Sequence, residues 1–376
     1  MATVPFAIRV FMRAHVETLR QEYDVTLFAN GDSGELIDLL GSHVMFRRVK
    51  IMRKVSIGLD FLALIDLWRQ FRRDQFDAVH SIMPKSGLLA MLAARLAGVP
   101  VRVHVFTGQV WATAAGARRQ LLRLADTVLA MNATRVLADS RSQRAFLIES
   151  GVVKATDIGV LADGSVAGVD VERFSRCPVA RERIRSERNI PGSAIVFLFL
   201  GRLTRDKGLH DLAAAFVEAA YFDPCIQLFV VGPDEEGFGQ LLDTLGARFP
   251  ARVHRAGFAE RPEDYMSASD VLCLPSYREG FGSVIIEAAS VGLPAIASRI
   301  YGITDSVIEG VTGVLHEPGS SKEIASAMLW LASSERVRAQ MGEAARLRVR
   351  DQFSESRVTT ALVEFYRHLF TESARG

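Results

Sequence analysis

Two glutamates, Glu279 and Glu287, lie eight positions apart in the stretch YREGFGSVIIEAASVGLPAIAS, residues 277 to 298. Glu287 follows three apolar residues, and a carboxylate there must face water or a partner, because burying an unpaired charge is costly. Glu279 opens the loop EGFG, whose glycines let a ligand approach the backbone. A helix starting at Ser283 would present free N–H groups that favour an anion. Since a carboxylate repels an anion, we expect both glutamates to accept hydrogen bonds from sugar or ribose hydroxyls.

Two cations that suit a diphosphate lie in a second glycine-containing loop, GRLTRDKG, residues 201 to 208. Arg202 is a forked cation and Lys207 a point charge. Phosphates held by these two, a ribose held by Glu287 and a second hydroxylated ring held by Glu279 add up to a nucleotide sugar. The alternatives are two ordinary surface cations, and a Glu279 that merely complements a helix N-terminus.

Short apolar runs alternate with amphipathic stretches and would position these loops. Such alternation predicts βαβ units and parallel sheets covered on both faces. The expected strands lie at residues 25–28, 78–80, 101–106, 135–138, 194–200, 226–231, 252–254, 271–274 and 295–297. The clearest expected helices lie at residues 11–20, 87–97 and 210–220. The fold class is therefore α/β, with ligand loops at the carboxyl ends of strands.

The length of 376 residues favours two domains. A polar, glycine-dotted stretch near residues 163–192 separates the two sets of strands. We therefore predict two doubly wound, Rossmann-like domains at residues 1–168 and 169–352, and a C-terminal helix at 353–376 that packs on the first domain. Because the first helical pattern begins almost at once, the opening strand is expected to be short or missing.

The composition excludes several classes of protein. No apolar run approaches the roughly 20 residues of a membrane span, and the start lacks a signal-peptide layout. The three cysteines are far apart and show no zinc spacing, so we expect neither a metal site nor disulfides, and a cytoplasmic location. The net charge of +2 and the absence of a recognisable module argue against nucleic-acid binding.

Residues 44 to 73 combine basic and bulky apolar side chains. The basic ones are Arg47, Arg48, Lys50, Arg53, Lys54, Arg69, Arg72 and Arg73. One interpretation is a solvated helix face. The other is attachment to an anionic membrane surface, where each basic residue contributes about 1 kcal/mol.

The pattern GRLxxxKG at 201–208 followed by EGFGxxxxE at 279–287 resembles the retaining glycosyltransferases of family 4, which have the GT-B fold. Residues 84–87, 103–111 and 164–174 resemble the subgroup that builds bacterial capsule, O-antigen and exopolysaccharide units. The resemblance implies a nucleotide-sugar donor, UDP-linked, in the C-terminal domain and a saccharide acceptor, lipid-linked, in the N-terminal domain. It also implies catalysis in the cleft between them, with no metal and no cofactor beyond the donor substrate.

The resemblance assigns roles to individual residues. Arg202 and Lys207 match the diphosphate ligands, Glu279 the carboxylate near the transferred sugar, and Glu287 the ribose ligand. The remaining donor-side residues are Gly201, Gly257, Phe258, Gly280, Phe281 and Gly282, and the acceptor-side residues are Lys85, Thr107 and Gly108. Family members often carry a histidine where this chain has Thr107, so His104 joins Arg202, Lys207 and Glu279 as a catalytic candidate. A strand histidine without a catalytic role is an equally good interpretation of His104.

Other functions are alternatives to a glycosyltransferase. One is a sugar-nucleotide hydrolase, epimerase or phosphorylase on the same fold. Another is a nucleotide- or saccharide-binding protein with a degenerate cleft, since the N-terminus is short and Thr107 departs from the family pattern. A dinucleotide dehydrogenase is weaker, because no GxGxxG follows the first strand.

Overall fold

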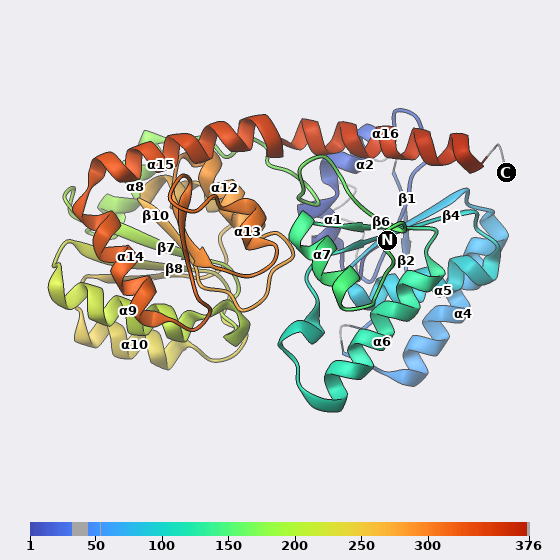
Figure 1. The fold of residues 1–376 in the computed structure, drawn as a ribbon, viewed down its shortest axis with the longest axis horizontal. Helices are drawn as coiled ribbons and strands as arrows, with labels where there is room; N and C mark the ends of the chain where they lie inside the picture. The colour runs from blue at the N-terminus through green and yellow to red at the C-terminus, as the bar shows by residue number, and fades with distance from the viewer. Residues whose placement is uncertain (32–43, 53, 374–376) are drawn as a thin grey trace. The chain divides into compact units, whose positions relative to one another are not determined.

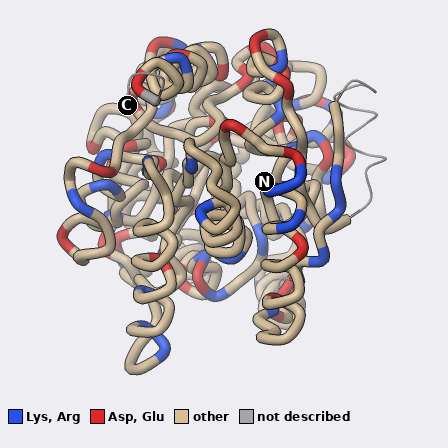
Figure 2. The backbone as a smooth tube through the Cα atoms, turned by 90° about the vertical axis from the view of Figure 1, so that its right-hand side faces the viewer, with Lys and Arg blue, Asp and Glu red and all other residues tan. Residues whose placement is uncertain are grey.

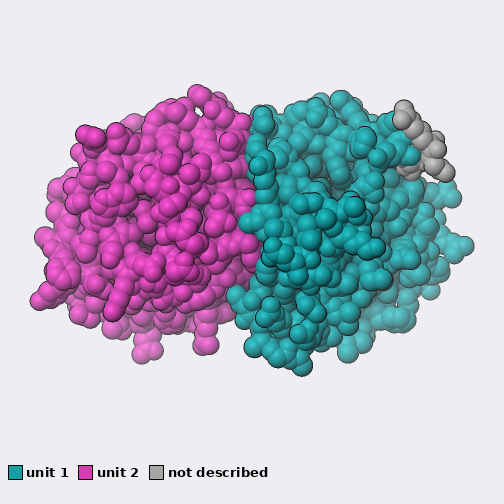
Figure 3. Space-filling model, viewed as in Figure 1, with its two compact units in different colours: residues 1–168, 355–376 teal, residues 169–354 magenta. Residues whose placement is uncertain are grey.

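The computed structural model describes residues 1–31, 44–52 and 54–373. The chain divides into two compact units, coloured separately in Figure 3. Unit 1 comprises Met1–Gly168 with Glu355–Gly376, and unit 2 comprises Val169–Ser354. Unit 2 therefore ends two residues beyond the predicted boundary at 352.

Unit 2 is built on a six-stranded sheet in the order β12-β11-β10-β7-β8-β9, with every neighbouring pair parallel (Figure 1). The chain runs outward from β7 to β9 and then returns to β10 on the other side of β7, so the strand order reverses between β7 and β10. Such a reversal is where open α/β sheets bind ligands. The strands are β7 (Ile195–Leu200), β8 (Ile226–Val231), β9 (Val253–Ala256), β10 (Val271–Leu274), β11 (Ala295–Ser298) and β12 (Gly313–His316).

Helices cover both faces of this sheet, which explains why β7 is an unbroken apolar run. Phe197 and Phe199 pack on one face, and Val196 and Leu198 pack on the other. Alternate residues of a strand point to opposite faces, so a doubly covered strand must be apolar throughout. The helices of unit 2 are α8 (Pro178–Glu187), α9 (Leu209–Phe222), α10 (Gly239–Arg248), α11 (Pro262–Ala268), α12 (Ser283–Val291), α13 (Ile303–Ser306), α14 (Ser321–Ser333) and α15 (Glu335–Arg348).

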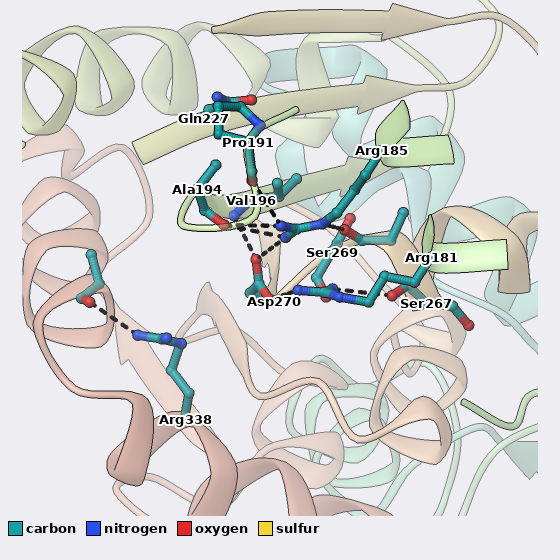
Figure 4. Close-up of polar contacts among 12 residues, drawn as sticks. Arg181, Arg185, Pro191, Ala194, Val196, Gln227, Ser267, Ser269, Asp270 and Arg338 are labelled. Carbon is teal, nitrogen blue, oxygen red and sulfur yellow. Dashed lines mark hydrogen bonds and ion pairs between the residues drawn. The ribbon is translucent and has the colours of Figure 1, made fainter. Parts of the chain in front are cut away.

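An arginine network fastens α8 to the amino-terminal edge of the sheet (Figure 4). The carboxylate of Asp270, just before β10, binds Arg181 at 2.8 Å and Arg185 at 2.7 Å. It also accepts the backbone N–H of Val196 at 2.8 Å. Arg185 is buried, and its other bonds go to the backbone carbonyls of Ala268, Ala194 and Pro191. The network therefore lies at the edge opposite to the strand ends that would bind ligands.

Unit 1 contains a four-stranded parallel sheet, β3-β4-β5-β6, and a parallel pair, β1-β2. The strands are β1 (Thr26–Ala29), β2 (Met45–Arg48), β3 (Ala78–Ile82), β4 (Val101–Phe106), β5 (Arg135–Ala138) and β6 (Ile158–Val160). The helices are α1 (Pro5–Phe11), α2 (Arg13–Leu19), α4 (Ile57–Asp74), α5 (Pro84–Ala97), α6 (Gly116–Asn132) and α7 (Arg141–Glu149). No helix within the described ranges is long and apolar enough to cross a bilayer.

Residues 1 to 3 join the two sheets of unit 1. Ala2 donates its N–H to Phe28 of β1 at 3.0 Å, and Ile82 of β3 donates to the carbonyl of Met1 at 3.1 Å. The expected short opening strand is thus a segment of three residues that bonds to both sheets without forming a regular strand. The helix predicted at 11–20 corresponds to α2, which begins at Arg13 because Met12, with φ −124°, is not helical, and α1 before it was not predicted.

The C-terminal helix α16 (Glu355–Ser373) belongs to unit 1. It follows α15 after a π-helical turn, Val349–Phe353, and the extended residue Ser354. Leu362, Tyr366 and Leu369 of α16 are buried in the same core as α1 and β4. The helix thus begins at Glu355 rather than at the predicted 353, because the π turn and Ser354 intervene.

Candidate active site

The reversal of strand order brings together the two loops that carry the predicted donor ligands. Residues 201–208 follow β7, and residues 275–282 follow its neighbour β10. Tyr277 donates its N–H to the carbonyl of Asp206 at 2.8 Å. Gly208 has φ +70°, and a Cβ there would lie 1.9 Å from the carbonyl oxygen of Pro275. The glycine is therefore required by the close approach of the loops as well as by its own backbone angle.

Two ion pairs connect these loops in a crossed arrangement. Lys207 contacts Glu279 at 2.5 Å, and Arg278 contacts Asp206 at 2.6 Å. Ser276, which is fully buried, donates to the same Glu279 oxygen at 2.8 Å. Burial alone would raise the pKa of Asp206, but the Thr204 hydrogen bond and the charges of Arg278 and Lys207 lower it overall. The structure thus brings Lys207 and Glu279 into direct contact, 72 residues apart in sequence.

Arg202 lies on the other side of the same loop and pairs with Glu235 at 2.9 Å. Glu235 belongs to the loop after β8, where Asp234 accepts backbone N–H groups from residues 236 to 239. These bonds, the one from Phe238 first, lower the pKa of Asp234. Sequence reasoning missed Glu235. Its signal was the run Asp234-Glu235-Glu236 directly after a strand that neighbours the cation loop.

Glu287 lies within α12, one to two turns after the loop that carries Glu279. Burial raises the pKa of Glu287 to about 7, against the nearby charge of Arg173, which lowers it. The carboxylate of Glu263, which also raises the pKa of Glu287, binds Arg173 at 3.1 Å. Arg173 and Glu263 were also missed by sequence reasoning. Arg173 lies in the stretch 164–174 that resembles the family, but nothing local marks it as a neighbour of Glu287.

The residues between the two glutamates have different surroundings. Gly282, with φ +72°, precedes α12 and provides no side-chain cap, so the first N–H groups of the helix are not capped by that residue. Phe281 is buried and contacts Phe353 at a ring distance of 5.1 Å. Its side chain therefore belongs to the core, so a contact of Phe281 with the donor would have to come from its backbone. Gly257 and Phe258 follow β9 at the same edge of the sheet, and both are exposed.

The acceptor-side candidates lie in unit 1. Thr107 and Gly108 are half-buried directly after β4. The Nζ of Lys85 contacts Asp60 at 2.7 Å and donates to the carbonyls of Met52 and Lys54 at 2.7 and 2.6 Å. Three partners occupy the three donors of the ammonium group. Lys85 therefore fastens the segment before α4 to the start of α5.

His104 lies in the interior of unit 1 and makes no contact with solvent. Its Nδ1 is 2.9 Å from the hydroxyl of Ser81, its ring packs on Phe106 at 4.7 Å, and Gly87 covers its edge. Burial lowers its pKa to about 3, so the ring is neutral. A strand covered by α5 turns this side chain into the core, which favours the interpretation of His104 as a strand histidine without a catalytic role.

Two regions of the chain match the models of known glycosyltransferase families. The model of the glycosyl transferase 4-like domain matches residues 7–164, and that of glycosyl transferases group 1 matches residues 180–348. The chain belongs to the group 1 glycosyltransferases of family 4. The loops with Lys207 and Glu279 lie within the second matched region. Among the described residues, no group of three or more His, Cys, Asp or Glu side chains is placed to hold a metal ion.

Relatives of this glycosyltransferase include two bacterial enzymes that match most of its length. CapM of Staphylococcus aureus, a capsular polysaccharide biosynthesis glycosyltransferase, is 28% identical over 96% of this chain and 94% of its own length. The Escherichia coli UDP-Gal:alpha-D-GlcNAc-diphosphoundecaprenol alpha-1,3-galactosyltransferase is 28% identical over 75% of this chain and 73% of its own.

Solved structures of similar fold confirm the GT-B prediction. HepE of Anabaena, in complex with UDP and glucose, has a TM-score of 0.80 at 20% identity, over 97% of this chain and 98% of that one. Sucrose-phosphate synthase of Thermosynechococcus elongatus has a TM-score of 0.80 at 21% identity, over 99% and 95% of the two chains.

Proposed function

We propose that this glycosyltransferase moves a hexose from a UDP-sugar to a lipid-linked saccharide during the synthesis of a cell-surface polysaccharide. The observation that carries the proposal is the contact of Lys207 with Glu279 where the strand order reverses, with Arg202 in the same loop and Glu287 in the following helix. Cations there suit a diphosphate, and carboxylates suit hydroxyl groups. The UDP complex of HepE supports UDP as the nucleotide, and the name of the E. coli relative supports a lipid diphosphate acceptor.

The proposed chemistry retains the anomeric configuration and needs no metal. The bond from the sugar C1 to the diphosphate oxygen breaks through an oxocarbenium-like state, and its electron pair stays on the phosphate. The acceptor hydroxyl oxygen bonds to C1 on the same face, and its proton passes to the departing phosphate. Arg202 and Lys207 stabilise the charge that grows on the leaving group, which is often a large catalytic term.

A nucleotide panel tests the donor assignment. Thermal unfolding is followed with UDP, GDP, ADP, NAD and common UDP-sugars. A ligand at 100 times its dissociation constant adds about 2.7 kcal/mol to the free energy of unfolding, which is readily measured. We expect UDP and one of its sugars to stabilise the protein and Glu287→Ala to lose the effect. Stabilisation by NAD alone would contradict the assignment.

Turnover and stereochemistry test the rest of the reaction. Release of UDP that depends on an added lipid-diphosphate saccharide separates a transferase from a binding protein with a degenerate cleft. The proton NMR coupling at the new anomeric centre reports its configuration. A product inverted relative to the donor would contradict retention.

The proposal places the enzyme on the cytoplasmic face of a membrane, through a surface around the start of α4. Exposed apolar side chains lie beside basic ones there: Met52, Val55, Ile57, Phe61 and Leu62 beside Lys50 and Lys54. Arg47 and Arg73 pair with Asp74, so they add less charge than the sequence suggested. Arg53 lies outside the described residues. Because basic and acidic positions are interspersed in Figure 2, the attraction depends on this local cluster.

Vesicle binding tests this surface. We expect Ile57→Ser with Phe61→Ser to weaken binding to vesicles of anionic lipid at low salt by about tenfold, since the apolar area that enters the interface is lost. The matched control is Tyr221→Ser with Phe222→Ser, an equally exposed apolar pair at the end of α9 in unit 2. Equal losses in the two double variants would show that this surface has no special role.

A further inference from the structure

Each of the two candidate diphosphate cations forms an ion pair with a carboxylate in the loop after a neighbouring strand. Lys207 pairs with Glu279 from the loop after β10, and Arg202 pairs with Glu235 from the loop after β8. Because β7 lies between β10 and β8, the cation loop has an acidic partner on each side. Glu279 already has a role in the proposed sugar contact. Glu235 has none, so its place beside Arg202 needs another explanation.

The backbone holds Glu235 in place. Leu203 donates to the carbonyl of Pro233 at 2.9 Å, and Glu235 donates back to the carbonyl of Leu203 at 3.3 Å. Two residues further along the cation loop, the N–H of Arg205 donates to the carboxylate of Glu236 at 2.8 Å. The acidic loop is therefore fastened to the cation loop at two points directly after Arg202. The contact between Glu235 and Arg202 follows from this fixed backbone.

Substrate and product of the proposed reaction differ in charge. The diphosphate of a nucleotide sugar carries two negative charges at neutral pH. When the sugar leaves, the terminal phosphate loses its only ester bond and gains a second ionisation, near the pKa of about 6 that phosphate monoesters show. The product therefore carries almost one more negative charge at pH 7.5. A carboxylate beside the cations repels this product more strongly than the substrate.

We propose that Glu235 is a specificity-determining residue that weakens the binding of the nucleoside diphosphate product relative to the nucleotide-sugar substrate. The inference rests on the proposed function, because it takes residues 201–208 as the diphosphate site. As a consequence, the nucleoside diphosphate product dissociates more readily, while the affinity for the nucleotide-sugar donor is largely kept. The side chains of Arg202 and Glu235 are 52% and 37% exposed, so solvent screens the effect and we expect a factor of about three to five.

The experiment compares Glu235→Gln with Glu236→Gln. Both remove one negative charge from the same loop and keep an oxygen acceptor, but Glu236 contacts a backbone N–H where Glu235 contacts a guanidinium. Calorimetry gives the dissociation constants of UDP and UDP-glucose at pH 7.5 and 5.5, at constant ionic strength. If GDP or ADP binds the wild type more tightly, that nucleotide and its glucose derivative are used instead.

We expect Glu235→Gln to tighten UDP about three- to fivefold more than it tightens UDP-glucose at pH 7.5. At pH 5.5 the terminal phosphate is mostly protonated, so Glu235→Gln should tighten UDP and UDP-glucose by nearly the same factor. Glu236→Gln should leave the ratio of the two constants within about 1.5-fold of the wild type, because its charge lies away from Arg202. A purely structural role of Glu235 would change both constants together at both pH values.

Three results would overturn the inference. The first is an unchanged ratio in Glu235→Gln at pH 7.5, and the second is the same change in Glu236→Gln, which would mean a general charge effect. The third is an excess that persists undiminished at pH 5.5. A wild type that binds no nucleoside diphosphate would contradict the proposed function itself, and the inference would fall with it.

Discussion

Polar side chains form a charged, partly exposed pair in the ligand loops of unit 2 and are neutral and buried at β4 and β5 of unit 1. Lys207 and Glu279 meet after β7 and β10 with 18% and 13% of their side chains exposed. His104 in β4 is fully buried, and Asp139 directly after β5 is nearly so. Both units have parallel sheets, so the architecture alone does not make a binding site. The two units differ in where these polar groups lie. In unit 2 they lie in glycine-containing loops outside the core, and in unit 1 they lie in the core.

Two carboxyl groups, one in each unit, have similarly raised pKa values but different neighbours. Burial raises the pKa of Glu287 in unit 2 to about 7 and that of Asp139 in unit 1 to about 8. The charges of Arg173 and Glu263 lie near Glu287 and act on its pKa. Asp139 is tied through its backbone to Gln143 and Ser165. A raised pKa therefore marks a buried carboxyl in both units, and charged neighbours distinguish the candidate ligand.

The largest expected effect is in the cation loop. Lys207→Ala should lower kcat by at least about 100-fold, because it removes a charge that stabilises the leaving phosphate. Steady-state kinetics with saturating donor measure it. The control is Arg205→Ala, which removes an exposed cation two positions away. Its kcat should stay within about threefold of the wild-type value. Comparable losses in the two variants would refute a specific role for Lys207.

Glu287→Gln should weaken nucleotide binding about tenfold, because a charged acceptor for the ribose hydroxyls is lost. The same change should stabilise the protein. Since the folded-state pKa is raised, the wild type loses stability as pH rises from about 4.5 to about 7, and a glutamine does not. Urea unfolding should show a gain of about 1–3 kcal/mol above pH 7 that vanishes near pH 4. Tighter nucleotide binding in the variant would contradict the ribose assignment.

Asp139→Asn in unit 1 is the counterpart of Glu287→Gln and should change stability without changing nucleotide affinity. Its stability gain should have the same sign, developing between pH 4 and 8, because the folded state keeps this carboxyl protonated until about pH 8. Nucleotide affinity, in contrast, should remain within about twofold of the wild type. If affinity fell as in Glu287→Gln, the two carboxyls would not differ in function as proposed.

The smallest catalytic effect is expected at His104. His104→Gln should cost about 1–3 kcal/mol of stability through lost packing, while kcat of the folded protein stays within about threefold. Burial lowers the pKa of His15, His80 and His104, so the unfolded chain takes up protons first and stability falls as pH drops below about 6.5. Urea unfolding at pH 7.5 and 5.0 should show a smaller acid loss in the variant. A 100-fold fall in kcat would restore the catalytic interpretation.

Local pattern was enough to predict much of the fold. The apolar runs at 101–106 and 135–138 are β4 and β5 with the predicted bounds. β2, β6 and β12 were missed. β2 includes two arginines, and β6 is only three residues long. The helix α1 was also missed, whereas the predicted helix at 11–20 corresponds to α2.

The sequence by itself determined the strand–loop–helix order, the glycines that shape the two ligand loops, and the presence of Arg202, Lys207, Glu279 and Glu287 in them. These features depend on neighbours within a few positions. Only the tertiary structure decided that Glu235 meets Arg202, that Lys85 is fully occupied by its own unit, and that His104 and Phe281 belong to the core. Such outcomes depend on which strands lie side by side and which faces helices cover. The partners come from segments some 30 to 70 residues away, where no local pattern reaches.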